Sequence, residues 1–550
     1  MRISGWLIAA LLLCWAGMAS AAPDTIYLNG KVWTGTSDTG FVQAFAVKGE
    51  RIVAVGDDRT IRPLARKGTK RVDLKGRLVT PGFIDNHTHF LGSSLALGAV
   101  NLRDAASPAE FAARIAARAR ERPGEWILDG MWDHELWGGA LPRRDWIDAA
   151  TGDTPVFVSR LDGHMALANS AALKRAGISA GTPDPPGGTI VRDAAGVPTG
   201  LLKDAAMGAV QKVIPPPSAE QVDAALARGF AHALSHGVTQ VHDMGWDWVP
   251  LEAFRRARVA GRLPIRVYAF VPISGWVRLA EFVRREGRGD DWLRWGGVKG
   301  FVDGSLGSTT AWFHAPYRDM PETSGLTVTD PAALAQMIRG AHRAGLQLAV
   351  HAIGDRANDW LLDTYAKVGG AAVRRARFRI EHAQHMTRAA IARAGAMEII
   401  PSMQPYHAID DGRWAEKRLG PERLKDMYAF RSLLAAGAPL TFGSDWSVAP
   451  LDPIAGIDAA VNRRTIDGRN PKGWQPQERV TVADALRAYT AANAYAGFQE
   501  DRLGRIVPGQ LADFVVLSQD IFTIDPARIG ETKVLRAVVG GRQGYAAPGA

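Results

Sequence analysis

Cysteine is almost absent from this chain of 550 residues. The single cysteine, Cys14, lies in an apolar N-terminal segment that follows Arg2 and ends in the small residues Ala19–Ala21. This pattern is typical of a cleaved signal peptide, so residues 1–21 are predicted to direct export, to the periplasm or out of the cell. The mature chain would then contain no cysteine, which excludes disulfide bonds and leaves stability to the apolar core.

Long hydrophobic runs are also missing. The apolar part of the signal is shorter than the about 20 residues that a membrane-spanning helix needs, and no longer apolar run follows it. We therefore expect no membrane association once the signal peptide is removed.

The sequence has no continuous basic tract. Removing Arg2 from the 66 Lys and Arg leaves 65 against 56 Asp and Glu, a formal charge of +9 that is scattered along the chain. Nucleic-acid binding favours clustered basic residues, so no nucleic-acid partner is predicted. A small-molecule substrate is expected instead, and a homo-oligomer is left open.

Short β-like runs occupy both ends of the mature chain. Residues 25–77 contain such runs between Gly and Asp turns, and a similar pattern returns at 512–517 and 534–539. We expect residues 22–77 and 500–550 to share one small β-sandwich domain.

Between these ends, short apolar strands alternate with amphipathic helices, as in consecutive β/α units. The predicted strands number eight: 78–90, 238–242, 265–270, 298–302, 346–351, 377–382, 399–403 and 439–444. One helix, 218–236, begins with the capping-box pair Ser218 and Gln221. Because no glycine-rich dinucleotide fingerprint follows the first strand, we predict an α/β fold in which residues 78–499 form a closed (β/α)8 TIM-like barrel.

The first connection of the barrel is longer than a crossover requires. Residues 101–215 contain a helix, a tryptophan-rich segment and a strand-like run. We expect an inserted subdomain after barrel strand 1, on the face where long loops shape access to the substrate.

The first barrel strand ends in His87-Thr88-His89. Residues i and i+2 of a strand share a face, so both imidazoles can reach one metal ion, although such a pair alone could equally be surface polarity. Candidate ligands end four further strands: Lys299, His351, His382 and Asp445. Strand ends on one face of a barrel converge on its axis, so these residues together predict a metal site.

The motifs around these residues resemble the metal-dependent amidohydrolase superfamily, in particular its N-substituted formamide deformylase-like branch. The resemblance rests on Pro-Gly-Phe-Ile-Asp-Asn-His-Thr-His, Val-Lys-Gly-Phe-Val-Asp-Gly-Ser-Leu-Gly, His-Ala-Ile-Gly-Asp, Arg-Ile-Glu-His-Ala-Gln and Phe-Gly-Ser-Asp-Trp. It covers nearly the whole mature chain and includes Asp162-Gly-His164 in the insertion. Asp204 departs from the branch, where we would expect Glu.

The resemblance implies two divalent metal ions, with zinc as the expected metal. His87 and His89 would hold one ion, and His351 and His382 the other. Lys299 would bridge the two ions as a carbamate, because a protonated lysine cannot ligate. Taken by itself, Lys299 could instead bind the substrate directly or lie outside a mononuclear site.

Asp445 is the implied catalytic residue. It would ligate a metal, orient the metal-bridging hydroxide that attacks the carbonyl, and carry the proton to the leaving nitrogen. The implied function is hydrolysis of a non-peptide carbon–nitrogen (amide) bond in an N-substituted amide or N-acyl amine. Without this context, Asp445 could simply cap the next helix.

Four residues are weaker candidates for substrate binding. His164 and Trp132 lie in the insertion, Asp303 follows the fourth strand, and Trp446 follows the eighth. Tryptophans can instead pack in a core or a lid. His242, at the end of the second strand, is expected to be structural.

Other functions stay open. An N-acyl amino-acid deacylase or peptidase would need a cationic anchor for the substrate carboxylate, and Arg160 is the candidate. A deaminase or isomerase could use the same scaffold. A non-catalytic, metal-containing binding or regulatory protein is expected to have lost Asp445 or Lys299 first, yet both are present.

Overall fold

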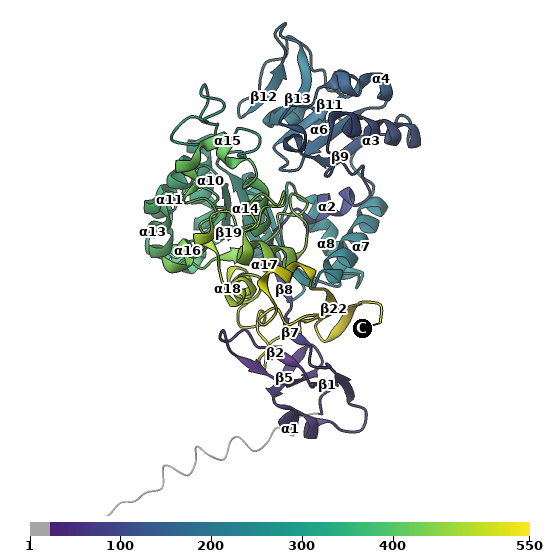
Figure 1. Cartoon of the computed structure of the whole chain (residues 1–550), viewed down its shortest axis with the longest axis vertical. Helices are drawn as coiled ribbons and strands as arrows, with labels where there is room; N and C mark the ends of the chain where they lie inside the picture. Colours follow the sequence, from purple (N-terminus) through teal and green to yellow (C-terminus); the bar gives the residue numbers. More distant parts are fainter. Residues whose placement is uncertain (1–21, 550) are drawn as a thin grey trace, which may run out of the picture.

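The computed structural model describes residues 22–549, so the predicted signal peptide, residues 1–21, lies outside the described part. Figure 1 shows an elongated molecule with the barrel in the middle, the insertion at one end and an N-terminal sheet at the other. Within residues 22–549, no helix is long and apolar enough to span a membrane.

Eight parallel strands form the central sheet, and each pairs with the next along the chain. They are β8 (Phe83–Thr88), β14 (Val238–Met244), β15 (Arg266–Pro272), β16 (Leu293–Phe301), β17 (Gln347–Ala352), β18 (Arg379–His382), β19 (Ile400–Met403) and β20 (Thr441–Phe442). The ring closes where the backbone N–H of Asp445 donates to the carbonyl of His87 (2.7 Å) and that of His89 donates to the carbonyl of Trp446 (2.9 Å). The predicted TIM-like barrel is confirmed.

Amphipathic helices cover the outside of the barrel. In α7 (Ala219–Ser235), the Ser218 hydroxyl accepts the backbone N–H of Gln221 and the Gln221 side chain accepts that of Ser218, which is the predicted capping box. The helices α8 (Val249–Val259), α10 (Pro331–Arg343), α11 (Asp355–Gly369) and α13 (Arg388–Ala396) bury their apolar faces against the strands in one continuous core.

The predicted first strand, 78–90, is wrong as a single element. β7 (Leu78–Pro81) pairs with strands from both chain ends, and only β8 enters the barrel. The break falls at Pro81, which has no N–H to donate, and at Gly82, where a Cβ would lie 2.3 Å from the Thr239 hydroxyl oxygen on β14. The chain therefore leaves one sheet at Gly82 and enters the other.

The chain ends form two packed sheets. The N-terminal sheet has the order β5-β4-β1-β6, and the mixed sheet has the order β23-β22-β21-β7-β2-β3. Their strands are β1 (Thr25–Leu28), β2 (Lys31–Trp33), β3 (Phe41–Val42), β4 (Ala44–Lys48), β5 (Arg51–Gly56), β6 (Lys70–Asp73), β21 (Phe514–Leu517), β22 (Val534–Val539) and β23 (Arg542–Ala546). Tyr27 stacks on Phe45 at 4.7 Å, and both rings meet Phe514 edge-on at 4.9 Å, so the interface of this sandwich joins the two ends of the chain.

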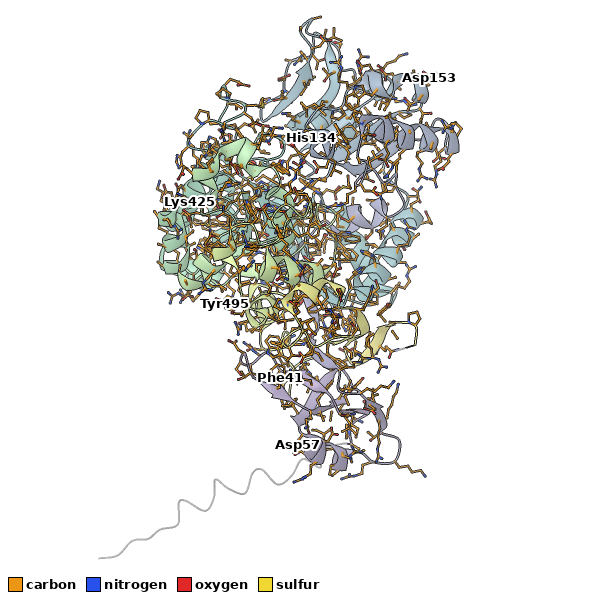
Figure 2. All side chains as sticks on the ribbon, viewed as in Figure 1. Phe41, Asp57, His134, Asp153, Lys425 and Tyr495 are labelled. Carbon is orange, nitrogen blue, oxygen red and sulfur yellow. The ribbon has the colours of Figure 1, made fainter. Side chains whose placement is uncertain are left out.

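The segment between β8 and β14 carries its own five-stranded sheet, in the order β12-β13-β11-β10-β9. The strands are β9 (Ile127–Trp132), β10 (Val156–Arg160), β11 (Met165–Ala168), β12 (Gly188–Arg192) and β13 (Pro198–Asp204), with α3 (Pro108–Glu121) packed against them. Asp133 and Glu135 pair with Arg413 (2.9 Å) and Arg418 (3.1 Å) on the barrel loop after β19. Figure 2 shows His134, which lies between the two acids, on the side of the insertion that faces the barrel.

Candidate metal centre

The six predicted ligands lie together at the carboxyl ends of the barrel strands. All except His89, which is partly buried, are buried side chains. His87, His382 and Asp445 form a group whose ligand atoms all lie within 4.8 Å of one another. The His351 ring is 4.5 Å from that of His382, between centroids, so His351 extends this group.

The closest approaches in the group join atoms that would face a cation. Asp445 Oδ1 lies 3.5 Å from Nε2 of His87 and 3.2 Å from Nε2 of His89. Lys299 Nζ lies 3.2 Å from the same His87 nitrogen. Residues that are more than two hundred positions apart thus meet at one point because barrel strands converge on their axis.

Each of the four histidines has one ring nitrogen held by a hydrogen bond. Nδ1 of His87 contacts a Glu381 carboxylate oxygen (2.6 Å), and Nδ1 of His89 donates to the carbonyl of Met244 (2.8 Å). Nε2 of His351 donates to the carbonyl of Gly304 (3.0 Å), and Nδ1 of His382 donates to Oε1 of Gln404 (2.8 Å). These acceptors fix the tautomers, so each ring keeps one lone pair free for a metal.

This geometry fits a divalent cation. The free Nε2 atoms of His87 and His89 and the carboxylate oxygen Oδ1 of Asp445 are all acceptors, and that oxygen is buried without a hydrogen-bond partner among the described residues. Buried acceptors that face one another are costly unless a positive charge lies between them. Imidazole nitrogen and carboxylate oxygen form a donor set that suits zinc.

Burial sets the charge of these groups. It lowers the pKa of His87 to about 4, helped by the positive charge of Lys299, and it lowers the pKa values of His351 and His382 well below their usual range. Burial would raise the pKa of Asp445, but the neighbouring histidines hold it well below its usual range. Neutral imidazoles around an ionised carboxylate are the protonation states that metal ligation requires.

The Asp445 loop is held in a restricted conformation. Asp445 has φ +58°, and Ser444 donates its backbone N–H to both oxygens of the Asp85 carboxylate at 3.0 Å. A Cβ on Gly443 would lie 2.4 Å from an Asn86 side-chain oxygen and 2.6 Å from Asp85, so only glycine fits there. Positive φ at a non-glycine residue persists only where the surroundings impose it, and such residues cluster at functional sites.

A buried network behind His87 was not predicted from the sequence. Arg379 donates Nε to Oε1 of Glu381 (2.7 Å) and Nη2 to Oε2 (3.0 Å), and Glu381 in turn holds His87. Nδ1 of His242 accepts from Arg379 at 3.0 Å, which is a structural role. Alternation along Arg379-Ile-Glu381-His382 shows that Arg379 and Glu381 share a face but places His382 on the other. His382 reaches the same centre because its backbone leaves the strand conformation at φ +75°, which the sequence pattern does not reveal.

Glu381→Gln is expected to weaken metal binding by about 10- to 100-fold, because the ring of His87 loses the charged acceptor that orients it. Competition against a chromophoric chelator measures this affinity directly. Glu478→Gln is a matched control, since Glu478 is also buried but accepts from Ser432 (2.6 and 3.0 Å). Equal metal affinity in both variants would show that Glu381 does not support metal binding.

A cavity of about 430 Å³ opens in front of these ligands. The barrel contributes one wall and the insertion the other, through residues that include Asp129, Met131 and His164. Asp162, in the insertion, connects the two walls. Its carboxylate accepts hydrogen bonds from the hydroxyls of Ser305 (2.5 Å) and Ser308 (3.0 Å) on the loop after β16. The insertion is therefore part of the site.

His164 lines this cavity, as expected for a residue that meets substrate. Its Nδ1 lies 2.6 Å from Asp204, and its ring is 5.2 Å from that of His351, between centroids. Burial opposes the charged form, but the hydrogen bond to Asp204 prevails and raises the pKa of His164. Asp204, which departs from the expected Glu, still supplies the carboxylate.

Trp132, Trp446 and Asp303 do not line the cavity. Trp132 is fully buried in the insertion core, where Nε1 donates to the carbonyl of Val158 (2.8 Å). Trp446 turns away from the site and stacks on His232 at 5.3 Å.

Asp303 instead organises the loops that carry His351. Its carboxylate accepts three backbone N–H groups, including that of Ile353 (3.0 Å), and lies 3.6 Å from the His351 ring. These three assignments to substrate binding are therefore corrected, because the direction of a side chain depends on packing partners that a single segment does not reveal.

Arg160, the candidate carboxylate anchor, is already paired. Its guanidinium lies 2.8 Å from Asp162 and 3.2 Å from Asp133, and the side chain is buried. Two carboxylates neutralise this single charge, which argues against a site for a free substrate carboxylate.

Comparisons with known proteins agree with this geometry. The model of the amidohydrolase family matches residues 70–545. The chain is 41% identical to Protein LONG AFTER FAR-RED 3 of Arabidopsis thaliana, covering 97% of this chain and 94% of that protein. It is 29% identical to N-substituted formamide deformylase of Arthrobacter pascens, covering 94% and 97%.

A solved structure extends the likeness to the fold. The crystal structure of an uncharacterized metal-dependent hydrolase from Pyrococcus horikoshii matches with a TM-score of 0.76 at 30% identity, covering 91% of this chain and 99% of that chain. The resemblance expected from the motifs is confirmed, and the chain belongs to the amidohydrolase family.

Proposed function

We propose that this protein hydrolyses a non-peptide amide bond, in an N-substituted amide or an N-acyl amine, with two divalent metal ions, zinc being the expected metal. The observation that carries the proposal is the set of four histidines, each anchored through one ring nitrogen, around an oxygen of Asp445 that has no hydrogen-bond partner among the described residues. Family membership and likeness to metal-dependent hydrolases support hydrolase activity in general.

The ligand roles follow from the grouping of the side chains. His87 and His89 would hold one ion with Asp445, and His351 and His382 would hold the other. A divalent ion at such a site supplies Lewis acidity and lowers the pKa of water from 15.7 to about 7.

Lys299 is proposed to bridge the ions as a carbamate. Burial lowers the pKa of Lys299 to about 8, which makes the free amine that reacts with carbon dioxide accessible near neutral pH. The amine lies 3.2 Å from Nε2 of His87, within reach of the same centre. A carbamate would replace this cationic neighbour by an anion, which suits a site for two cations.

Asp445 is proposed to move the proton. Its ionised carboxylate can accept a proton from the attacking water and deliver it to the leaving nitrogen, as a general base and then a general acid. The restricted loop keeps Asp445 in place, and His164, on the opposite wall, is available to contact the substrate.

The substrate class rests on the relative named N-substituted formamide deformylase and on the absence of a free cationic anchor near the site within residues 22–549. An N-acyl amino-acid deacylase or peptidase is less well supported, because Arg160 is paired with two carboxylates.

A substrate panel tests the proposal. The zinc-loaded protein is expected to hydrolyse N-substituted formamides or acetamides, to lose activity when a chelator removes the metal, and to regain it with added zinc. N-acyl amino acids, deaminase substrates and lactones are the matched comparisons. Preference for N-acyl amino acids would replace the proposed substrate class by that of a deacylase, and preference for deaminase substrates or lactones would replace the amide hydrolase. A metal-loaded protein that turns over nothing would favour the non-catalytic binding protein.

A further inference from the structure

One carboxylate in the cavity wall has no partner. Asp129, on β9, lines the cavity and is partly buried. No hydrogen bond or ion pair joins its carboxylate to another residue in the described part of the chain. Burial alone raises its pKa to about 6, with no charged neighbour to oppose the shift.

Each of the other acids of the insertion wall and the neighbouring loops has at least one polar partner, although Oδ2 of Asp204 has none among the described residues. Asp162 pairs with Arg160 (2.8 Å), Asp204 contacts His164 (2.6 Å), and Asp410 pairs with Arg413. Asp411 accepts from Gln384 and Tyr428, both at 2.6 Å.

Within residues 22–549, no Lys or Arg that lines the cavity compensates the negative charge of Asp129. Among the described residues, Arg160 and Lys299 are the only Lys or Arg side chains that line it. Arg160 is neutralised and Lys299 lies in the metal centre, so the unbalanced charge on the insertion wall is the negative charge of Asp129.

The backbone of β9 holds this carboxylate in the wall. Asp129, Gly130 and Met131 have φ values of +67°, +94° and +60°, and the pairing with β10 shifts register at this point. A Cβ on Gly130 would lie 2.6 Å from Leu102 in the core, whereas the residues on either side of it line the cavity. Three consecutive positive φ values persist only where the surroundings impose them, which is typical of functional sites.

The same wall contacts the loop that carries Asp445. The Met131 sulfur accepts from the hydroxyl of Ser447 at 3.5 Å, two residues after Asp445. Across the cavity, Trp246 stacks on Phe301 at 5.1 Å and on His89 at 4.9 Å, and 58% of its surface is exposed. An aromatic face and a methionine can hold an alkyl chain, and the aromatic face also favours a cation.

We propose that the substrate carries a protonated amine beyond the scissile amide, and that the carboxylate of Asp129 binds this amine. This inference rests on the proposed amide hydrolase function and specifies its substrate as an N-acyl derivative of a diamine or a comparable amino-substituted amine. An ammonium group would give the partly buried carboxylate a charged partner, and it would make a substrate carboxylate unfavourable at the same position.

Two formamides of equal size test the proposal. N-formyl-1,4-diaminobutane and N-formylpentylamine differ in one terminal ammonium or methyl group. The protein is expected to have a kcat/KM at least about 10-fold higher for the cationic compound, as one charge-assisted hydrogen bond provides. Asp129→Asn is expected to remove most of this ratio.

Asp153→Asn is the matched control, because Asp153 is an exposed acid of the same insertion and Figure 2 shows it at the end far from the barrel. This variant should keep the ratio of the unchanged protein. A ratio near one, or a ratio that Asp129→Asn leaves unchanged, would overturn the role of Asp129 and leave the amide hydrolase standing.

Binding of n-butylammonium, measured by calorimetry, separates the two proposals. Saturable binding that Asp129→Asn weakens at least about 10-fold, in a protein that hydrolyses none of the formamides and acetamides of the substrate panel, would support the cation site and reject the amide hydrolase. Absence of binding, or equal binding to both variants, would reject the cation site whatever the hydrolysis result.

Discussion

Asp445→Asn is expected to lower kcat by about a thousandfold, within the range that loss of a general acid–base catalyst brings, while most of the metal content remains. Asparagine keeps an oxygen that can ligate, but its amide cannot accept the proton of the attacking water. The neighbouring histidines hold the pKa of Asp445 well below its usual range and so keep its carboxylate ionised. An amide does not ionise, so these histidines cannot make the asparagine a base. Steady-state kinetics and elemental analysis of metal per chain measure both parts of the prediction.

Asp452→Asn provides the control for this substitution. Asp452 follows on the same loop and caps α17 (Pro453–Asn462), where its carboxylate accepts the backbone N–H groups of Ile454 and Ala455. Asn is an equally good helix cap, so this variant should keep its activity and its metal. Retained turnover in Asp445→Asn would remove the proton-shuttle role.

Lys299→Ala is expected to lower the metal content from two ions per chain towards one, with a corresponding loss of activity. The amine is buried 3.2 Å from Nε2 of His87, so its removal leaves a gap at the point where a bridging anion would lie. A short carboxylate such as acetate or propionate should fill this gap and restore part of the metal content and activity. Metal analysis with and without the carboxylate measures the effect.

Lys203→Ala is the comparison for Lys299→Ala. Lys203 belongs to β13, and its amine donates to the carbonyl of Ser308 (3.0 Å), away from the metal ligands. Burial lowers the pKa of both lysines, so each variant loses an amine that is at least partly buried. If Lys299→Ala bound as much metal as Lys203→Ala, the bridging carbamate would be rejected.

The barrel strands and the grouping of six ligands were predictable because they depend on local rules. Alternation along a strand places His87 and His89 on one face, and parallel strands in a closed barrel bring their carboxyl ends together. Strand alternation did not identify Glu381, because it places residues 381 and 382 on opposite faces, whereas His382 leaves the strand conformation at φ +75°. These conclusions require only period, strand order and residue type.

Contacts between distant segments required the tertiary structure. Thr239 leaves no room for a side chain at Gly82, and the neutralisation of Arg160 depends on Asp133 as well as on nearby Asp162. Trp132 fills the insertion core, while Asp129 on the same strand lines the cavity.

The sequence by itself therefore determined the family, the barrel and the grouping of the candidate metal ligands, because they follow from the alternation of strands and helices and from short motifs at strand ends. Only the tertiary structure decided which carboxylates are paired, which tryptophans are buried, and that Asp129 has no partner in the cavity wall among residues 22–549. Pairing and burial depend on which distant segments pack together, and no local pattern in the chain specifies them.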